Sequence, residues 1–162
     1  ICDETTQYGF VAQLRSQIPT EIGCVLWLAQ RRPDCQAFIP WYSGISHTPE
    51  SYAYGDHQIA LHLHFNPPDY YYERSGKHAF WAFVSLAEKV DENYRELLPK
   101  VRLKLEPIEH TALQNQQQFE LKILDVWEVD RGGAIQMLTE YTSEYAGEVL
   151  NISRQMLKEA RD

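Results

Sequence analysis

One stretch of the chain, residues 22–29, constrains the fold most, because it is strand-like and apolar on both faces. It reads IGCVLWLA, and only its glycine interrupts the apolar character. A strand of this kind lies in a sheet that is covered on both sides, by helices or by a second sheet. The rest of the chain offers too few elements for two covering layers. We therefore expect the chain to be a piece of a larger structure.

Two further strand-like runs flank this one, YGFVAQLR before it and QAFIPWY after it. The turn signals Ile18-Pro19-Thr20 and Arg32-Pro33-Asp34 separate the three runs. We therefore expect successive antiparallel strands within residues 5–42. The residues that follow Ile1, CDETTQYGF, already read as a strand inside a sheet. We expect the function to depend on polypeptide upstream of Ile1.

The character of the chain then changes twice. Residues 43–76 are rich in Pro, Gly, Tyr, His and Asp, which predicts irregular wrapping structure with one short strand at 59–65. After residue 76, apolar residues recur at spacings of three and four in three stretches, which predicts three long helices. Pro99 should end the first helix and suit the first turn of the second, and Pro107 should kink the second or delay its start. The third follows the sequence DRGG at residues 130–133.

These patterns predict an α+β fold in two regions. Antiparallel strands and a wrapping loop occupy residues 1–76, and a helical region occupies residues 77–162. The 162 residues are 44% hydrophobic and 23% charged, as in soluble globular proteins. The net charge of −8 speaks against nucleic acid and anionic membranes as partners. No apolar stretch approaches the length that spans a bilayer.

Three cysteines, Cys2, Cys24 and Cys35, form an odd set without CxxC spacing. Neither a disulfide framework nor a zinc site is indicated, so we expect free thiols, which favour a reducing compartment such as the cytoplasm. Cys2 lacks the free amine of an N-terminal nucleophile because Ile1 precedes it. We interpret Cys24 as an inert core thiol, and Cys35 lies at a turn with no obvious base.

Three histidines, His57, His62 and His64, lie within eight residues. In a strand, His62 and His64 would share one face, as two metal ligands do, but no third ligand is evident. Surface histidines in a polar loop are the alternative interpretation. We assign no metal ligand, no cofactor-binding residue and no cofactor.

Aromatic residues gather in the same region and in the third strand-like run. They could line a groove for a small molecule or peptide, or pack the loop onto the rest of the fold. The set is Tyr70, Tyr71, Tyr72 and Glu73-Arg74, together with Trp41 and Tyr42.

Several strings, read in order, carry a resemblance. They are TTQYGFVAQLR, IPTEIGCVLWLAQRRPD, AFIPWYSGI, TPESYAY and FWAFVSLAEKVDENY, continuing to LTEYTSEYAGEVL. In order, spacing and residue types the chain resembles the C-terminal third of the cysteine dipeptidases that include dipeptidase A and are similar to the secernins. The segment HQIALHLHFNPPDYYYERSG and Cys35 depart from the family pattern.

The resemblance implies an N-terminal-nucleophile hydrolase with a four-layer αββα architecture, of which this chain would hold a part. In such enzymes an N-terminal Cys attacks the peptide carbonyl and its α-amine handles the proton. Cys2 does not align with that nucleophile, so no catalytic residue is transferred to this chain. The implied partners are a dipeptide substrate, bound by the parent enzyme, and the N-terminal part of the same protein.

The leading hypothesis is therefore the C-terminal portion of a cysteine-type dipeptidase, inactive alone. Two alternatives stay open: a non-catalytic interaction or assembly module of a dipeptidase-like protein, and an acylase that acts on a non-peptide amide. A homo-oligomer is compatible with each.

Overall fold

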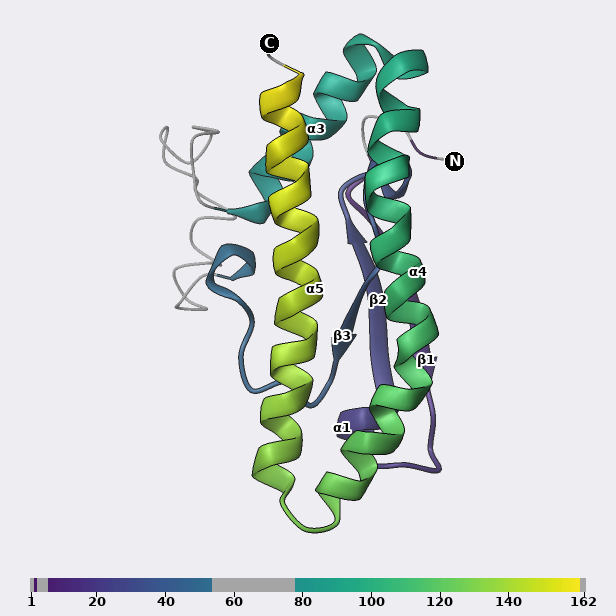
Figure 1. Cartoon of the computed structure of the whole chain (residues 1–162), viewed down its shortest axis with the longest axis vertical. Helices are drawn as coiled ribbons and strands as arrows, with labels where there is room; N and C mark the ends of the chain where they lie inside the picture. The colour runs from purple at the N-terminus through teal and green to yellow at the C-terminus, as the bar shows by residue number, and fades with distance from the viewer. Residues whose placement is uncertain (1, 3–5, 54–77, 161–162) are drawn as a thin grey trace.

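The computed structural model describes Cys2, residues 6–53 and residues 78–160. A small antiparallel sheet lies against a layer of long helices, with α4 and α5 side by side along its length (Figure 1). This arrangement confirms the α+β class and the order of strands followed by helices. The strands are β1 (Tyr8–Leu14), β2 (Cys24–Gln30) and β3 (Ile39–Tyr42), and the long helices are α3 (Ala79–Glu92), α4 (Tyr94–Trp127) and α5 (Arg131–Glu159).

The strand order in the sheet is β1-β2-β3, and both pairs are antiparallel. Tyr8 pairs with Gln30 and Leu14 with Cys24, so β1 and β2 match over their whole length. The two predicted turns contain a short helix, α1 (Thr20–Gly23), and a 3-10 turn, η1 (Pro33–Cys35). A second 3-10 turn, η2 (Glu50–Tyr52), follows β3. A Cβ on Gly23 would lie 2.5 Å from the Arg15 carbonyl oxygen, so the β1–β2 connection requires glycine there.

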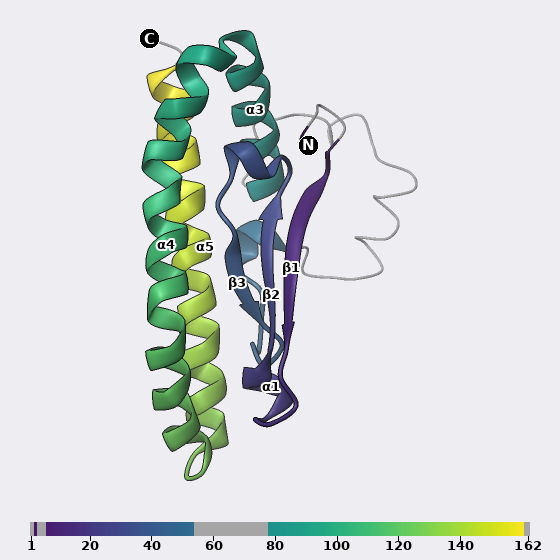
Figure 2. The same cartoon turned by 90° about the vertical axis from the view of Figure 1, so that its right-hand side faces the viewer.

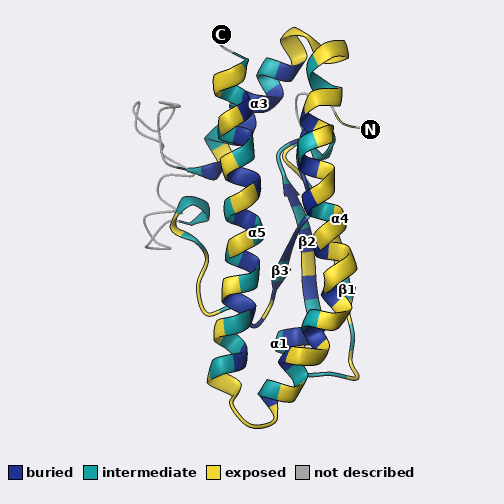
Figure 3. Cartoon of the chain, in the orientation of Figure 1, coloured by how far each residue is buried: buried dark blue, intermediate teal, exposed yellow. Residues whose placement is uncertain are grey.

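Helices α4 and α5 cover one face of the sheet, which we call the inner face, while α3 and η2 pack against the opposite side of β3. Val25, Trp27 and Ala29 of β2 are buried there, as is Tyr42 of β3. Figure 3 shows the buried positions of α4 and α5 in dark blue, interleaved with exposed positions in yellow. This is the pattern of amphipathic helices that bury one stripe. A second apolar cluster joins η1 and β3 to α3, α4 and α5, with Phe83 at its centre.

Over β1 and β2, the described residues provide no comparable cover on the opposite face, which we call the outer face. Alternate residues of a strand point to opposite faces, so the neighbours of the buried residues of β2 lie on this side. Leu26 of β2 is exposed, and in β1 Phe10 is 58% and Leu14 77% exposed. Figure 2 shows β1 farthest from α4 and α5. The described part of the chain thus buries one side of β2 and leaves β1 largely exposed.

The boundary between the first two long helices differs from the prediction. The break falls at Asn93, and Pro99 lies inside α4 together with Pro107. Asn93 leaves helical geometry with φ −146° and ψ 62°, and its side-chain amide donates to the Glu96 carboxylate at 2.8 Å. Asn hydrogen-bonds locally and so favours helix ends. Pro99 as the end of the first helix was therefore wrong.

The last helix begins at Arg131, inside the DRGG sequence rather than after it. The Asp130 carboxylate accepts a hydrogen bond from the Gly133 N–H at 2.9 Å and caps α5. Within the described residues, no helix combines the length and apolar character that crossing a membrane requires.

Candidate functional site

The three cysteines lie in different environments, and all are free thiols. Cys2 is exposed, Cys24 is half-buried and Cys35 is fully buried. Cys24 pairs with Leu14 across β1 and β2, so its side chain belongs to the outer face rather than to the inner core. The structure does not bring the three thiols together as one site.

Cys35 is held in a thiol state that disfavours nucleophilic attack. Burial raises its pKa to about 12, and the neighbouring Asp34 carboxylate acts in the same direction. Arg32 donates to its Sγ at 3.4 Å, which opposes the shift without overcoming it. Because the thiolate is the nucleophile, a thiol with so high a pKa is inert at neutral pH.

Arg32 is a buried cation that forms ion pairs with two more exposed carboxylates. Its guanidinium bonds both Asp34 carboxylate oxygens at 3.1 Å and Asp91 of α3 at 2.5 Å. Only 4% of the Arg32 side chain is exposed, so the two carboxylates compensate a charge that would otherwise be costly to bury. These ion pairs tie η1 to α3 and have a structural role.

A second polar network joins the sheet to α4 and was not predicted. Arg15 forms a two-pronged bond to the Glu120 carboxylate, at 2.6 and 2.7 Å. The Tyr42 hydroxyl donates to the same carboxylate at 3.0 Å, and the Gln116 amide donates at 2.9 Å. Gln116 also donates to Gln13 of β1 at 2.6 Å. Each oxygen of this buried carboxylate therefore has a donor.

The network raises the pKa of both groups that donate to the carboxylate from the sheet. For Arg15 the largest cause is its hydrogen bond to Glu120. For Tyr42 it is burial, followed by the negative charge of Glu120. These shifts make Arg15 a permanent cation and Tyr42 a permanent donor. The sequence signal was the interruption of the apolar stripe of α4 at Gln116, since a polar residue on a buried helix face requires a partner.

A serine and a histidine that are adjacent in sequence also make contact. Ser46 Oγ lies 3.0 Å from His47 Nδ1 and 3.2 Å from Thr139 Oγ1. The Ser46 N–H donates to the same Thr139 oxygen at 2.9 Å. The pair is exposed, and the bonds to Thr139 fix the loop after β3 on α5. We interpret this contact as a loop anchor and not as a nucleophile with its base.

The two aromatic candidates in β3 point to opposite faces of the sheet. Tyr42 lies on the inner face, edge-on to Phe119 and Tyr141 with ring centroids 6.0 and 6.1 Å away. Trp41 packs against Tyr52 at 5.3 Å. The two rings therefore cannot line one groove. The other aromatic candidates and the three clustered histidines lie outside the described residues.

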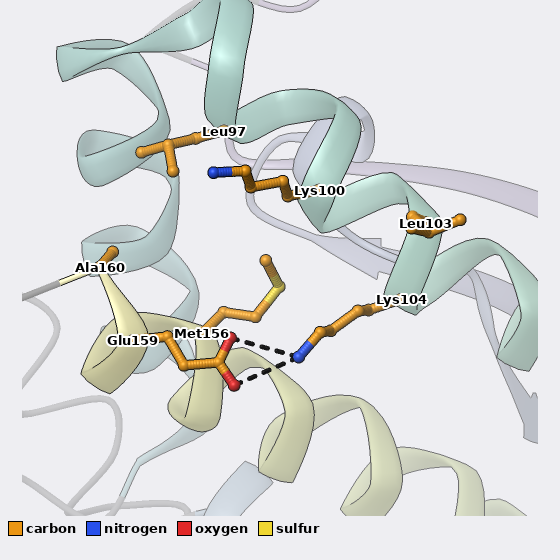
Figure 4. A pocket seen from close by; sticks show the side chains of 7 residues that line it. All are labelled: Leu97, Lys100, Leu103, Lys104, Met156, Glu159 and Ala160. Atoms are coloured by element: carbon orange, nitrogen blue, oxygen red, sulfur yellow. Dashed lines mark hydrogen bonds and ion pairs between the residues drawn. The ribbon is translucent and has the colours of Figure 1, made fainter. Parts of the chain in front are cut away.

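A cavity of about 240 Å³ lies between the start of α4 and the end of α5. Leu97 and Met156 supply apolar surface, while Lys100 and Lys104 stand at its rim (Figure 4). Lys104 bonds both carboxylate oxygens of Glu159 at 3.2 and 3.3 Å. Lys100 is paired with Glu96 at 2.6 Å. Because carboxylates already neutralise both ammonium groups, the cavity does not form an anion site.

Among the described residues, no group of three or more His, Cys, Asp or Glu side chains is placed to hold a metal ion. Among the same residues, the buried thiol of Cys35 has Asp34 and Arg32 as its charged neighbours rather than a histidine. The functional feature that the described structure does present is the apolar outer face of β1 and β2.

The model of peptidase family C69 matches residues 1–106. The match includes all three strands, α3 and the first part of α4. No curated protein matches the chain closely enough for comparison. Since the match extends over more than half of the 162 residues, the chain belongs to peptidase family C69, the family of dipeptidase A and the secernins.

Proposed function

We propose that this chain is the C-terminal portion of a cysteine-type dipeptidase whose nucleophilic thiol lies on an upstream part of the same polypeptide. Membership of a peptidase family supports peptide-bond hydrolysis. The finer assignment, to dipeptides and to an N-terminal cysteine, rests on the residue strings that resemble dipeptidase A. In that chemistry the thiolate attacks the carbonyl carbon, and the α-amine accepts the thiol proton and delivers it to the leaving amine.

The observation that carries the proposal is the outer face of the sheet. Large apolar side chains of β1 and β2 stand exposed there, on a surface without a charged residue. A contiguous apolar patch of this kind marks an interface. A second sheet, packed face to face at roughly 10 Å, would cover it and produce the two inner layers of an αββα hydrolase. The residues on this face are Tyr8, Phe10, Ala12, Leu14, Cys24, Leu26, Leu28 and Gln30.

The state of the thiols agrees with a nucleophile located elsewhere. Cys35 is buried with a raised pKa, and Cys24 lies on the face that the second sheet would cover. Cys2 is exposed, and it follows Ile1, so its nitrogen is an amide and cannot accept a proton as an α-amine does. Residues 1–76 and 77–162 then together form one C-terminal portion of the larger hydrolase.

The proposal is tested by comparing dipeptide hydrolysis by this 162-residue chain with hydrolysis by the longer polypeptide, each with and without a thiol-blocking reagent. We expect thiol-sensitive turnover only from the longer polypeptide. Thiol-sensitive turnover by the 162-residue chain alone would overturn the assignment of the nucleophile to the upstream part. An active longer polypeptide that is insensitive to thiol reagents would overturn the cysteine mechanism.

A further inference from the structure

The two edge strands of the sheet, β1 and β3, differ in how well their outward-facing backbone groups are protected. At the β3 edge, Pro40 has no N–H to offer, and its carbonyl accepts a hydrogen bond from the Thr142 hydroxyl of α5 at 3.0 Å. Proline and a covering helix are two of the ways in which proteins protect an edge strand. At the β1 edge the strand contains no proline, and no helix among the described residues lies along it; β1 reads YGFVAQL and pairs with β2 in continuous register, without a bulge.

The register shows which backbone groups of β1 are left open. The Arg31 N–H donates to the Gln7 carbonyl and the Arg15 N–H donates to the Gly23 carbonyl. In an antiparallel pair such bonded residues alternate with non-bonded ones, so the odd-numbered residues of β1 bond to β2. The even-numbered residues direct N–H and C=O groups away from it. These open positions are Tyr8, Phe10, Ala12 and Leu14.

The helix layer covers β1 incompletely, because it contacts the strand near Gln13 but leaves Val11 exposed. Val11 lies on the inner face opposite Trp27, yet Val11 is 58% exposed while Trp27 is 3% exposed. The outer-face side chains of the same strand are exposed as well. On the inner face, Gly9 lies close to Pro33 and Gln13 bonds to Gln116 of α4, so Val11 is the exposed inner-face position of β1. Within the described residues, β1 is therefore open at its edge, on its outer face and at Val11.

We infer that the sheet continues past β1: a further strand pairs with the even-numbered residues, and it belongs to the part that carries the nucleophile. This inference rests on the proposed function and names which surface that part engages. The uncharged side chains of β1 favour an uncharged partner strand with an apolar outer side. On the inner face, the part of the polypeptide that carries this strand must also cover the exposed side chain of Val11.

A second copy of this chain fits the edge less well. One seven-residue strand pair buries less surface than the roughly 1,000 Å² that a specific interface between separate chains needs. A strand of the same polypeptide is tethered to β1, so its effective concentration at the edge is high. It can therefore pair stably with a smaller buried area than a separate chain needs. The upstream part of the polypeptide is therefore the occupant that the structure favours.

Residue-resolved amide hydrogen exchange tests the inference. In the 162-residue chain we expect slow exchange at Gly9, Val11 and Gln13 and fast exchange at Phe10, Ala12 and Leu14. In the longer polypeptide, exchange at the second set should slow by at least about tenfold. Fast exchange there in the longer polypeptide would overturn the inference. Protection in the short chain that grows with protein concentration would assign the edge to a second copy and overturn it too.

A pair of proline variants provides the matched control. Ala12→Pro removes an N–H that points to the open edge, whereas Val11→Pro removes one that bonds to β2. In the 162-residue chain we expect Val11→Pro to lower the melting temperature clearly and Ala12→Pro to leave it nearly unchanged. In the longer polypeptide both should lower it. Unchanged melting of Ala12→Pro there would contradict the added strand.

The dipeptidase assay separates this inference from the proposed function. An active, thiol-sensitive longer polypeptide whose even-numbered amides exchange fast would refute the added strand alone. A polypeptide with protected amides but without hydrolysis would refute the proposed activity alone.

Discussion

The Glu120 carboxylate is the best place to test how the sheet is fixed to α4. The variant Glu120→Ala removes the acceptor of both Arg15 prongs, of the Tyr42 hydroxyl and of one Gln116 donor. The Arg15 side chain is about one-third exposed, so its guanidinium can hydrogen-bond to water in the variant. The broken ion pair therefore contributes little to the loss of stability. Tyr42 is 1% exposed, and its hydroxyl loses its acceptor inside the core.

The magnitude follows from these environments. A buried donor without an acceptor costs about 1–3 kcal/mol. The cavity left by the Glu120 stem adds about 1 kcal/mol. We therefore expect Glu120→Ala to lower the free energy of unfolding by about 3 kcal/mol, which corresponds to a melting temperature lower by about 6–12 °C in a chain of this size.

Urea unfolding of the 162-residue chain, followed by circular dichroism, measures the effect. Asp125→Ala is the matched control, because Asp125 is an exposed carboxylate on the same helix. Its substitution should change the free energy of unfolding by less than about 0.5 kcal/mol. A loss below about 1 kcal/mol for Glu120→Ala, or equal losses for both variants, would refute the assignment of this network as a stabilising link.

Three further results are expected. Asp130→Ala should cost about 1 kcal/mol through the lost α5 cap, and urea unfolding that shows no change would contradict the capping bond. Phe83→Ala, a fully buried ring, should cost about 3–5 kcal/mol, whereas Phe80→Ala at an exposed site should cost far less; similar losses by thermal melting would contradict the core assignment. A maleimide should label Cys2 within minutes in the native protein and Cys35 only on unfolding, because Cys35 is fully buried and burial raises the pKa of its thiol. Native labelling of Cys35 at pH 7, seen by mass spectrometry, would contradict its burial.

Local patterns were sufficient to predict most of the fold. Alternation in YGFVAQLR, the apolar run of β2 and the proline turns gave three antiparallel strands, and spacings of three and four gave three helices. These signals act within a few residues of one another, so a single sequence contains them. The resemblance carried by the ordered strings agreed with the family match.

The features that were missed depend on distant pairings. Arg15 and Glu120 are 105 positions apart, and nothing local to either residue predicts their bond. Local proline rules placed a helix boundary at Pro99, but the boundary lies at Asn93, and α4 accommodates Pro99 without ending. The opposite orientations of Trp41 and Tyr42 follow from strand alternation, so the sequence alone is sufficient to exclude a groove that both rings line.

The most direct test of the central claim is to find which thiol reacts with substrate. A dipeptide that carries a chloromethyl ketone should alkylate the nucleophilic cysteine of the longer polypeptide, and peptide mapping by mass spectrometry identifies the modified residue. We predict a single modified cysteine, located upstream of Ile1. Substrate-protected modification of Cys2, Cys24 or Cys35 would contradict the claim and place the nucleophile within this chain.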